Sequence, residues 1–151
     1  MFTEAPFSLM DLISIVVATI LGCGWMLLYT RKWQKAAVAI DPNIAAAQRR
    51  WMPRSYFLGF CAMLALACGL AVELQLIGPQ LSSSLVMQAV RVSALNWIFI
   101  VYPVGLGPFL WEARPWRICA MNISYHFVLM LILSLVIQFF PQAVGQLSSI
   151  H

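Results

Sequence analysis

Residues 118–140 read ICAMNISYHFVLMLILSLVIQFF, an apolar stretch that holds no Asp, Glu, Lys or Arg and stops at Pro141. Three further, mainly apolar stretches lie at about residues 12–29, 56–76 and 90–111. Each is long enough to cross a hydrocarbon layer of about 30 Å as a helix. In lipid, a single span satisfies its backbone hydrogen bonds only as a helix. The sequence therefore predicts an all-α, polytopic membrane protein: one domain, 1–151, built as a bundle of four transmembrane helices.

The composition supports lipid as the solvent for this chain. Hydrophobic residues make up 62% of it and charged residues 9%, whereas about a quarter of an ordinary soluble domain is charged. A chain this poor in charge cannot cover a water-facing surface, so the lipid bilayer is its first predicted partner. The net charge of +4 lies in short loops between apolar stretches. It is typical of a topology signal, and nucleic acid is not a predicted partner.

The positions of the basic residues predict the orientation. The loop 30–55 and the turn between the third and fourth spans hold eight of them: Arg31, Lys32, Lys35, Arg49, Arg50, Arg54, Arg114 and Arg117. Only Arg91 lies near the opposite ends of the spans. The positive-inside rule makes the basic side cytoplasmic. We therefore expect a multi-pass protein of the cell inner membrane, with loop 30–55 cytoplasmic and both termini on the extracytoplasmic side.

Two shorter segments refine this topology. Glu4 and Asp11 precede the first span in place of a basic region, so the start of the chain does not resemble a cleavable signal peptide. Residues 42–51 within the loop, preceded by Asp41 as a plausible N-cap, predict a short helix on the membrane surface. A plain solvated connector is the alternative.

The two halves of the chain share the pattern G-x-G-x(6)-R-x-W, at residues 22–33 and again at 105–116. The second span of each half then begins with Ser-Tyr, at 55–56 and 124–125. Two duplicated helical hairpins, related by a pseudo-two-fold axis along the membrane normal, would give this pattern. The alternative is that Gly and Trp are simply common near span ends. In both cases we expect close helix packing at four glycines: Gly22, Gly24, Gly105 and Gly107.

Ionisable residues inside a membrane are costly and are candidates for function. Asp11, Glu73 and Arg91 lie near the outer ends of the first three spans. If they meet at one level, an Arg–carboxylate cluster would lower the desolvation cost of each charge. The cluster would be either a gate or binding site for a charged solute, or a structural clasp. Snorkelling of Arg91 to the interface is a further alternative.

A second polar group lies on the fourth span. Asn122 and His126 are four residues apart and share a helix face. We expect His126 to be neutral and hydrogen-bonded, to Asn96 or to a tyrosine; a proton relay or a ligand role is the alternative. Asn96 alone is typical of hydrogen bonding between helices.

The chain carries no recognisable catalytic or metal-binding pattern. No CxxC pair, HExxH sequence or phosphate loop occurs, and no two carboxylates lie together in mid-membrane. We therefore predict no catalytic residue, no metal site, no cofactor and no enzymatic activity.

Several motifs together resemble a known family. They are Gly22-Cys-Gly24-Trp25 with Tyr29, the stretch WIFIVYP at 97–103, WEARPW at 111–116 and NISYH at 122–126. The sequence resembles the small bacterial membrane proteins catalogued as domain of unknown function 1761. The resemblance implies a four-span protein of a bacterial cytoplasmic membrane and implies no activity. Met26 stands where that family usually has a tyrosine.

Three functions remain open from the sequence. The first is a non-enzymatic interaction protein or accessory subunit, which forms a homo-oligomer or joins a larger membrane complex. The second is a small oligomeric transporter or channel built from the duplicated hairpins. The third, with weaker support, is a membrane enzyme or cofactor binder that uses His126.

Overall fold

The computed structural model describes residues 8–40, 43–112 and 115–148, and all secondary structure within them is helical. The elements are α1 (Leu9–Ile40), α2 (Asn43–Leu76), α3 (Gly78–Leu81), α4 (Leu85–Asn96), the π-helix η1 (Trp97–Val101), α5 (Tyr102–Trp111) and α6 (Trp116–Ser148). Four segments are long and apolar enough to cross a membrane: Leu9–Arg31, Tyr56–Leu76, Leu85–Trp111 and Trp116–Gln146. The predicted all-α fold with four membrane-spanning helices is confirmed.

The segment expected to be a loop, 30–55, is helical wherever the structure describes it. Residues 30–40 continue α1, and 43–55 form the first part of α2. Residues 43–51 are helical as predicted, but they belong to the long helix α2, so the expectation of a separate short helix is wrong; residues 41 and 42 lie outside the described residues. Both arms are rich in Ala, Lys, Gln and Arg, which favour helix at little cost. The spanning helices accordingly continue beyond the membrane.

The fourth span also extends farther than expected. Pro141 lies inside α6, which continues to Ser148. A proline removes one backbone donor from a helix, and Pro141 stands only two turns from the end of α6, so the loss of one hydrogen bond does not end the helix.

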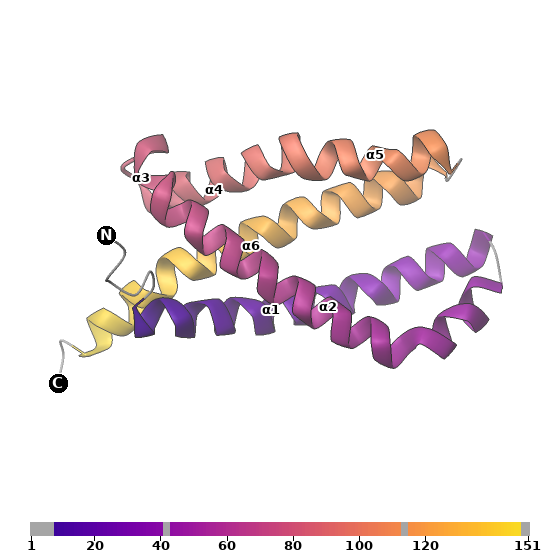
Figure 1. Cartoon of the computed structure of the whole chain (residues 1–151), viewed down its shortest axis with the longest axis horizontal. Coiled ribbons are helices and arrows are strands. Elements are labelled where there is room, and N and C mark those ends of the chain that lie inside the picture. The colour runs from indigo at the N-terminus through magenta and orange to yellow at the C-terminus, as the bar shows by residue number, and fades with distance from the viewer. Residues whose placement is uncertain (1–7, 41–42, 113–114, 149–151) are drawn as a thin grey trace, which may run out of the picture.

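The helices form two hairpins, one of α1 with α2 and the other of α4, η1 and α5 with α6 (Figure 1). The start of α1, the end of α6 and α3 lie at one end of the molecule. The end of α1, the start of α2, the end of α5 and the start of α6 lie at the other (Figure 1). Near the α3 end, α6 packs against α1, α2 and α4. Toward the other end α5 packs against α6 but against neither α1 nor α2, and the hairpins diverge.

The core lies where the four spans meet. Its residues come from α1, α2, α4 and α6, and its smallest side chains, Ala18 and Ala67, are fully buried together with Leu133. Small residues let membrane helices approach closely, and tight packing is what holds them together in lipid. Two hydrogen-bonded pairs also join α4 to α6: Ser93 Oγ donates to Ser134 Oγ at 3.0 Å, and Gln138 Nε2 donates to Gln88 Oε1 at 3.0 Å.

The third span is not one regular α-helix. Between α4 and α5 lies η1, and the N–H of Tyr102 donates to the carbonyl of Trp97, five residues earlier. Pro103 follows directly, and its ring removes a backbone donor and crowds the carbonyl four residues before it. The wider π turn accommodates that disruption without ending the span.

The predicted glycine contacts occur at one glycine of each pair. A Cβ on Gly22 would lie 2.7 Å from Met63 Sδ, and a Cβ on Gly105 would lie 2.5 Å from Ile123 Cγ1. In each hairpin, therefore, the first glycine faces the other helix of that hairpin. Around Gly24 and Gly107, apart from their sequence neighbours and the backbone of their own helix, no atom of the described residues lies within 4 Å of such a Cβ. The expectation of close packing at these two is wrong. Residues two positions apart on a helix point to nearly opposite faces, so the second glycine of each motif faces away from the helix that the first one contacts.

Candidate functional site

A polar contact between two spans joins Glu73 and Asn96. Glu73 lies in the last turn of α2, and Asn96 is the last residue of α4. Asn96 Nδ2 donates to Glu73 Oε2 and also to the carbonyl of Val92, at 3.1 Å. Both side chains are half-buried. A carboxylate and an amide, far apart in sequence, thus meet between two helices at the point where η1 begins.

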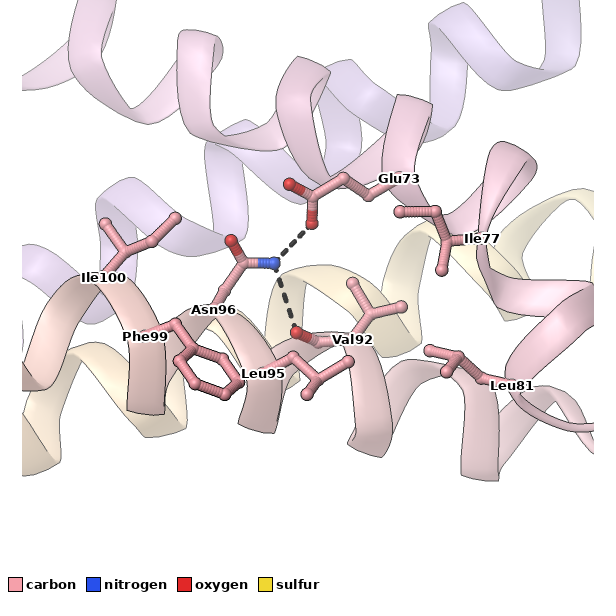
Figure 2. A pocket seen from close by; sticks show the side chains of 8 residues that line it. All are labelled: Glu73, Ile77, Leu81, Val92, Leu95, Asn96, Phe99 and Ile100. Atoms are coloured by element: carbon pink, nitrogen blue, oxygen red, sulfur yellow. Dashed lines mark hydrogen bonds between the residues drawn. The ribbon is translucent and has the colours of Figure 1, made fainter.

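These two residues lie in a groove between α2 and the third span. Figure 2 shows the Glu73 and Asn96 side chains pointing toward one another, with apolar side chains around them. The cavity here has a volume of about 220 Å³. Its lining, which we call the Glu73 groove, consists of Glu73, Ile77, Leu81, Val92, Leu95, Asn96, Phe99 and Ile100.

The Glu73 groove opens toward the outside of the bundle. Phe99 is 72% exposed and Ile100 is 56% exposed, whereas Val92 at the base is buried. Polar residues in membrane bundles normally face the interior or a water-filled path. A carboxylate in an outward-facing, otherwise apolar groove can accept a hydrogen bond or pair with a cation that approaches from outside the chain.

The expected cluster of Asp11, Glu73 and Arg91 is not formed, because each residue has a different partner. The Asp11 carboxylate accepts hydrogen bonds from the backbone N–H of Ser8 at 2.9 Å and from its hydroxyl at 2.8 Å, which closes the start of α1. Arg91 Nη1 donates to the carbonyl of Leu81. The Asp11 carboxylate therefore stabilises the start of α1. The exposed Arg91 side chain links α4 to Leu81, the last residue of α3.

The polar residues of α6 form a different arrangement from the expected one. His126 Nδ1 lies 2.8 Å from the carbonyl of Asn122, in its own helix, and neither Asn96 nor a tyrosine supplies that partner. The side-chain oxygen of Asn122 accepts a hydrogen bond from the hydroxyl of Tyr29 on α1, at 3.4 Å. Asn122 and His126 therefore lie together, but Asn96 lies with Glu73 instead.

Aromatic residues contribute contacts that the polar residues of the sequence did not indicate. Trp97, the first residue of η1, donates its indole N–H to the carbonyl of Ile123 on α6, at 2.9 Å. Tyr29 and Tyr125 stack with ring centroids 3.9 Å apart. The recurrence of Ser-Tyr at the start of the fourth span was the signal that pointed to Tyr125. In the part of the chain that the structure describes, no three His, Cys, Asp or Glu side chains gather as metal ligands.

Comparison with protein families gives one match. Residues 11–138 match the family described as protein of unknown function (DUF1761). No curated protein and no solved structure matches the chain. The matched region runs from the start of α1 to within α6 and so takes in all four spans, both hairpins and the Glu73 groove. The chain therefore belongs to the DUF1761 family.

Proposed function

We propose that this protein is a non-enzymatic membrane interaction protein that assembles with a second copy of itself through the Glu73 groove. The observation that carries the proposal is the outward-facing carboxylate of Glu73, held by Asn96 in an apolar groove between two spans. An acyl chain offers no donor to a carboxylate, and an unsatisfied polar group in hydrocarbon costs several kcal/mol. A neighbouring helix that covers the groove would remove that cost.

The charges near the groove favour a second copy as the occupant. Arg91 is exposed on α4, one turn from Leu95 of the groove, and Glu73 lies close to the same end of the bundle. A two-fold axis along the membrane normal keeps each residue at its own depth and brings the same surface of both copies together. Arg91 lies five residues from Asn96, a rise of about 7.5 Å along α4, which an extended arginine side chain spans to approach the partner's Glu73. A guanidinium has five donors, so its bond to Leu81 leaves others for such a contact.

The extent of outward-facing surface also supports assembly. In the most apolar window of each span, between 22% and 28% of the residues are buried within the bundle. Most of each span is therefore available to lipid or to another chain. We also propose that the end with both hairpin connections faces the cytoplasm, as the exposed Arg31, Lys35, Arg54 and Arg117 there favour.

Cysteine cross-linking in native membranes tests the proposed interface. In a background with the four native cysteines replaced by alanine, Phe99→Cys places a thiol on the groove. Ile20→Cys is the matched control, since it is 61% exposed against 72% for Phe99 but lies on α1. We expect a short bis-maleimide to give a dimer with Phe99→Cys and monomer with Ile20→Cys. Equal cross-linking at both positions, or none at either, contradicts the proposal.

A small oligomeric transporter or channel is the second candidate. It is favoured by η1, because π turns inside spans are frequent at functional sites, and η1 directly follows Asn96. Vesicles loaded with a pH-sensitive dye separate the two candidates. Proton uptake that requires this chain and is lost in Glu73→Gln would favour the transporter, and dimers without any such flux would favour the interaction protein.

A further inference from the structure

A second cavity lies on a different side of the bundle, between α1 and α6. Its volume is about 360 Å³, within the range of small-molecule sites. The lining consists of Trp25, Leu28 and Tyr29 from α1 and of Met121, Ser124, Tyr125 and Val128 from α6. None of these residues belongs to the Glu73 groove, so the cavity is independent of the interface proposed above.

Two buried polar atoms of this lining lack a hydrogen-bond partner. They are Trp25 Nε1 and the hydroxyl oxygen of Tyr125, whose residue is 8% exposed. A buried polar group without a partner costs about 1–3 kcal/mol, and native proteins rarely leave one unsatisfied. Both residues line one cavity, and the two atoms themselves are covered by the protein, so a molecule in the cavity reaches them after a small rotation of the two side chains.

The chemistry of the two atoms limits what that partner is. An indole N–H only donates, and a phenolic hydroxyl donates as well as accepts. Both are therefore satisfied by an acceptor oxygen. The Tyr29 hydroxyl, which donates to Asn122 on α6, is not within hydrogen-bonding geometry of either atom.

The remaining walls are apolar and aromatic. Trp25 and Tyr125 lie parallel within 4°, with ring centroids 6.3 Å apart, and Tyr29 stacks on Tyr125. Leu28, Met121 and Val128 complete the lining with aliphatic surface. Such walls suit the body of a lipid-soluble molecule.

We infer that this cavity binds a lipid-soluble molecule through carbonyl oxygen, which accepts hydrogen bonds from the Trp25 indole and the Tyr125 hydroxyl. Two sources offer this chemistry within a membrane: the acyl esters of phospholipids and lipid-soluble quinones. The site is formed within one chain and needs no partner copy.

Identification of bound molecules is the first part of the test. The full chain is purified from its membrane in mild detergent, and an organic extract is analysed by chromatography and mass spectrometry. A stoichiometric quinone or a retained phospholipid each supports the inference and distinguishes the source. The extract of Trp25→Phe should retain at least about fivefold less of the same molecule, since a lost hydrogen bond of about 1 kcal/mol corresponds to that factor.

Binding of defined probes is the second part. Native mass spectrometry follows addition of a decyl-substituted benzoquinone, of a short-chain phospholipid and of decylbenzene, which lacks carbonyl oxygen. We expect one carbonyl-bearing probe to bind and decylbenzene not to bind. Tyr125→Phe should weaken binding about fivefold or more, whereas Tyr102→Phe, on an exposed tyrosine outside the cavity, should leave it unchanged.

Two results would overturn the inference. One is equal binding of decylbenzene and the carbonyl probes, which needs no variant and so does not depend on whether the variants fold. The other is absence of any bound molecule, both in the extract and with the probes. Unchanged binding in both Trp25→Phe and Tyr125→Phe would likewise refute the assigned donors.

Discussion

Gly105 marks the closest approach of α5 to α6. A Cβ there would lie 2.5 Å from Cγ1 and 3.1 Å from Cδ1 of Ile123. The first of these atoms is next to the branch point of the side chain, so it has little freedom to move away. At Gly22 the nearest atom is instead the sulfur of Met63, near the end of a flexible chain. The two glycines are equivalent in sequence but differ in how much substitution they tolerate.

We predict that Gly105→Ala lowers the free energy of unfolding by about 1–3 kcal/mol, the usual cost of overpacking. Gly22→Ala should cost less, because Met63 can adopt another rotamer. The midpoint of thermal unfolding in mild detergent, measured for each variant, checks both. Gly107→Ala is the matched control, since nothing lies within 4 Å of its Cβ; a loss of stability there equal to that of Gly105→Ala would contradict the account.

Single residues also show where sequence-based reasoning succeeds and fails. Glu73 and Asn96 were recognisable as costly intramembrane polar groups, but their pairing was not predictable, because it depends on the crossing of α2 and α4. Trp25 occurred in the sequence only within a family motif and Tyr125 only in the repeated Ser-Tyr and the NISYH stretch, and neither was a candidate for function, since aromatic residues are common in spans. Their lack of hydrogen-bond partners is visible only once the packing of α1 on α6 is known.

At the scale of elements, η1 distinguishes the third span from the first. A π turn holds one more residue than the α turn it replaces. Removing one residue from it would therefore restore a regular helix while the flanking parts, α4 and α5, keep their faces. Removing one residue from an α-helix instead rotates everything beyond it by about 100°.

We predict that deletion of Ile98, which lies in η1 and is 48% exposed, leaves a folded, membrane-inserted protein. Deletion of Ile20, 61% exposed within the regular helix α1, should greatly reduce the folded yield, because it turns Gly22 away from Met63. Monodisperse material recovered by size-exclusion chromatography measures both. The reverse order of the two yields would contradict the assignment of η1 as the extra turn.

The spans themselves were predictable because length and hydropathy decide them. The helical continuation of α1 and α2 was predicted only for 42–51, because charged and polar residues such as those of 30–55 are also typical of loops. Lys, Arg, Gln and Ala all have high helix propensity. α1 therefore continues to Ile40, and α2 begins at Asn43, well before its apolar part. α2 ends at Leu76, just before Gly78 and Pro79, which are poor residues for a helix interior and begin the short helix α3; residues 82–84 then separate α3 from α4.

At the scale of the whole molecule, the two hairpins pack tightly near α3 and diverge toward their connections (Figure 1). The sequence pattern G-x-G-x(6)-R-x-W occurs in both hairpins, yet only the hairpin of the third and fourth spans contains the π-helix η1. The contact of α1 with α6 is extensive, whereas its counterpart between α2 and α4 is slight and contains the Glu73 groove. The proposed interface thus lies where two neighbouring helices of the bundle, α2 and α4, contact each other only slightly.

In the proposed topology the chain crosses the membrane four times, with the α3 end outside and the opposite end of the bundle in the cytoplasm. Labelling of intact cells with a membrane-impermeant maleimide tests it most directly, in the cysteine-free background. Ser83→Cys, between α3 and α4, should label in intact cells, and Lys35→Cys, on the exposed arm of α1, should label only after lysis. Labelling of Lys35→Cys but not Ser83→Cys in intact cells would invert the orientation. Labelling of both in intact cells, with the membrane demonstrably sealed, would contradict the four-span arrangement.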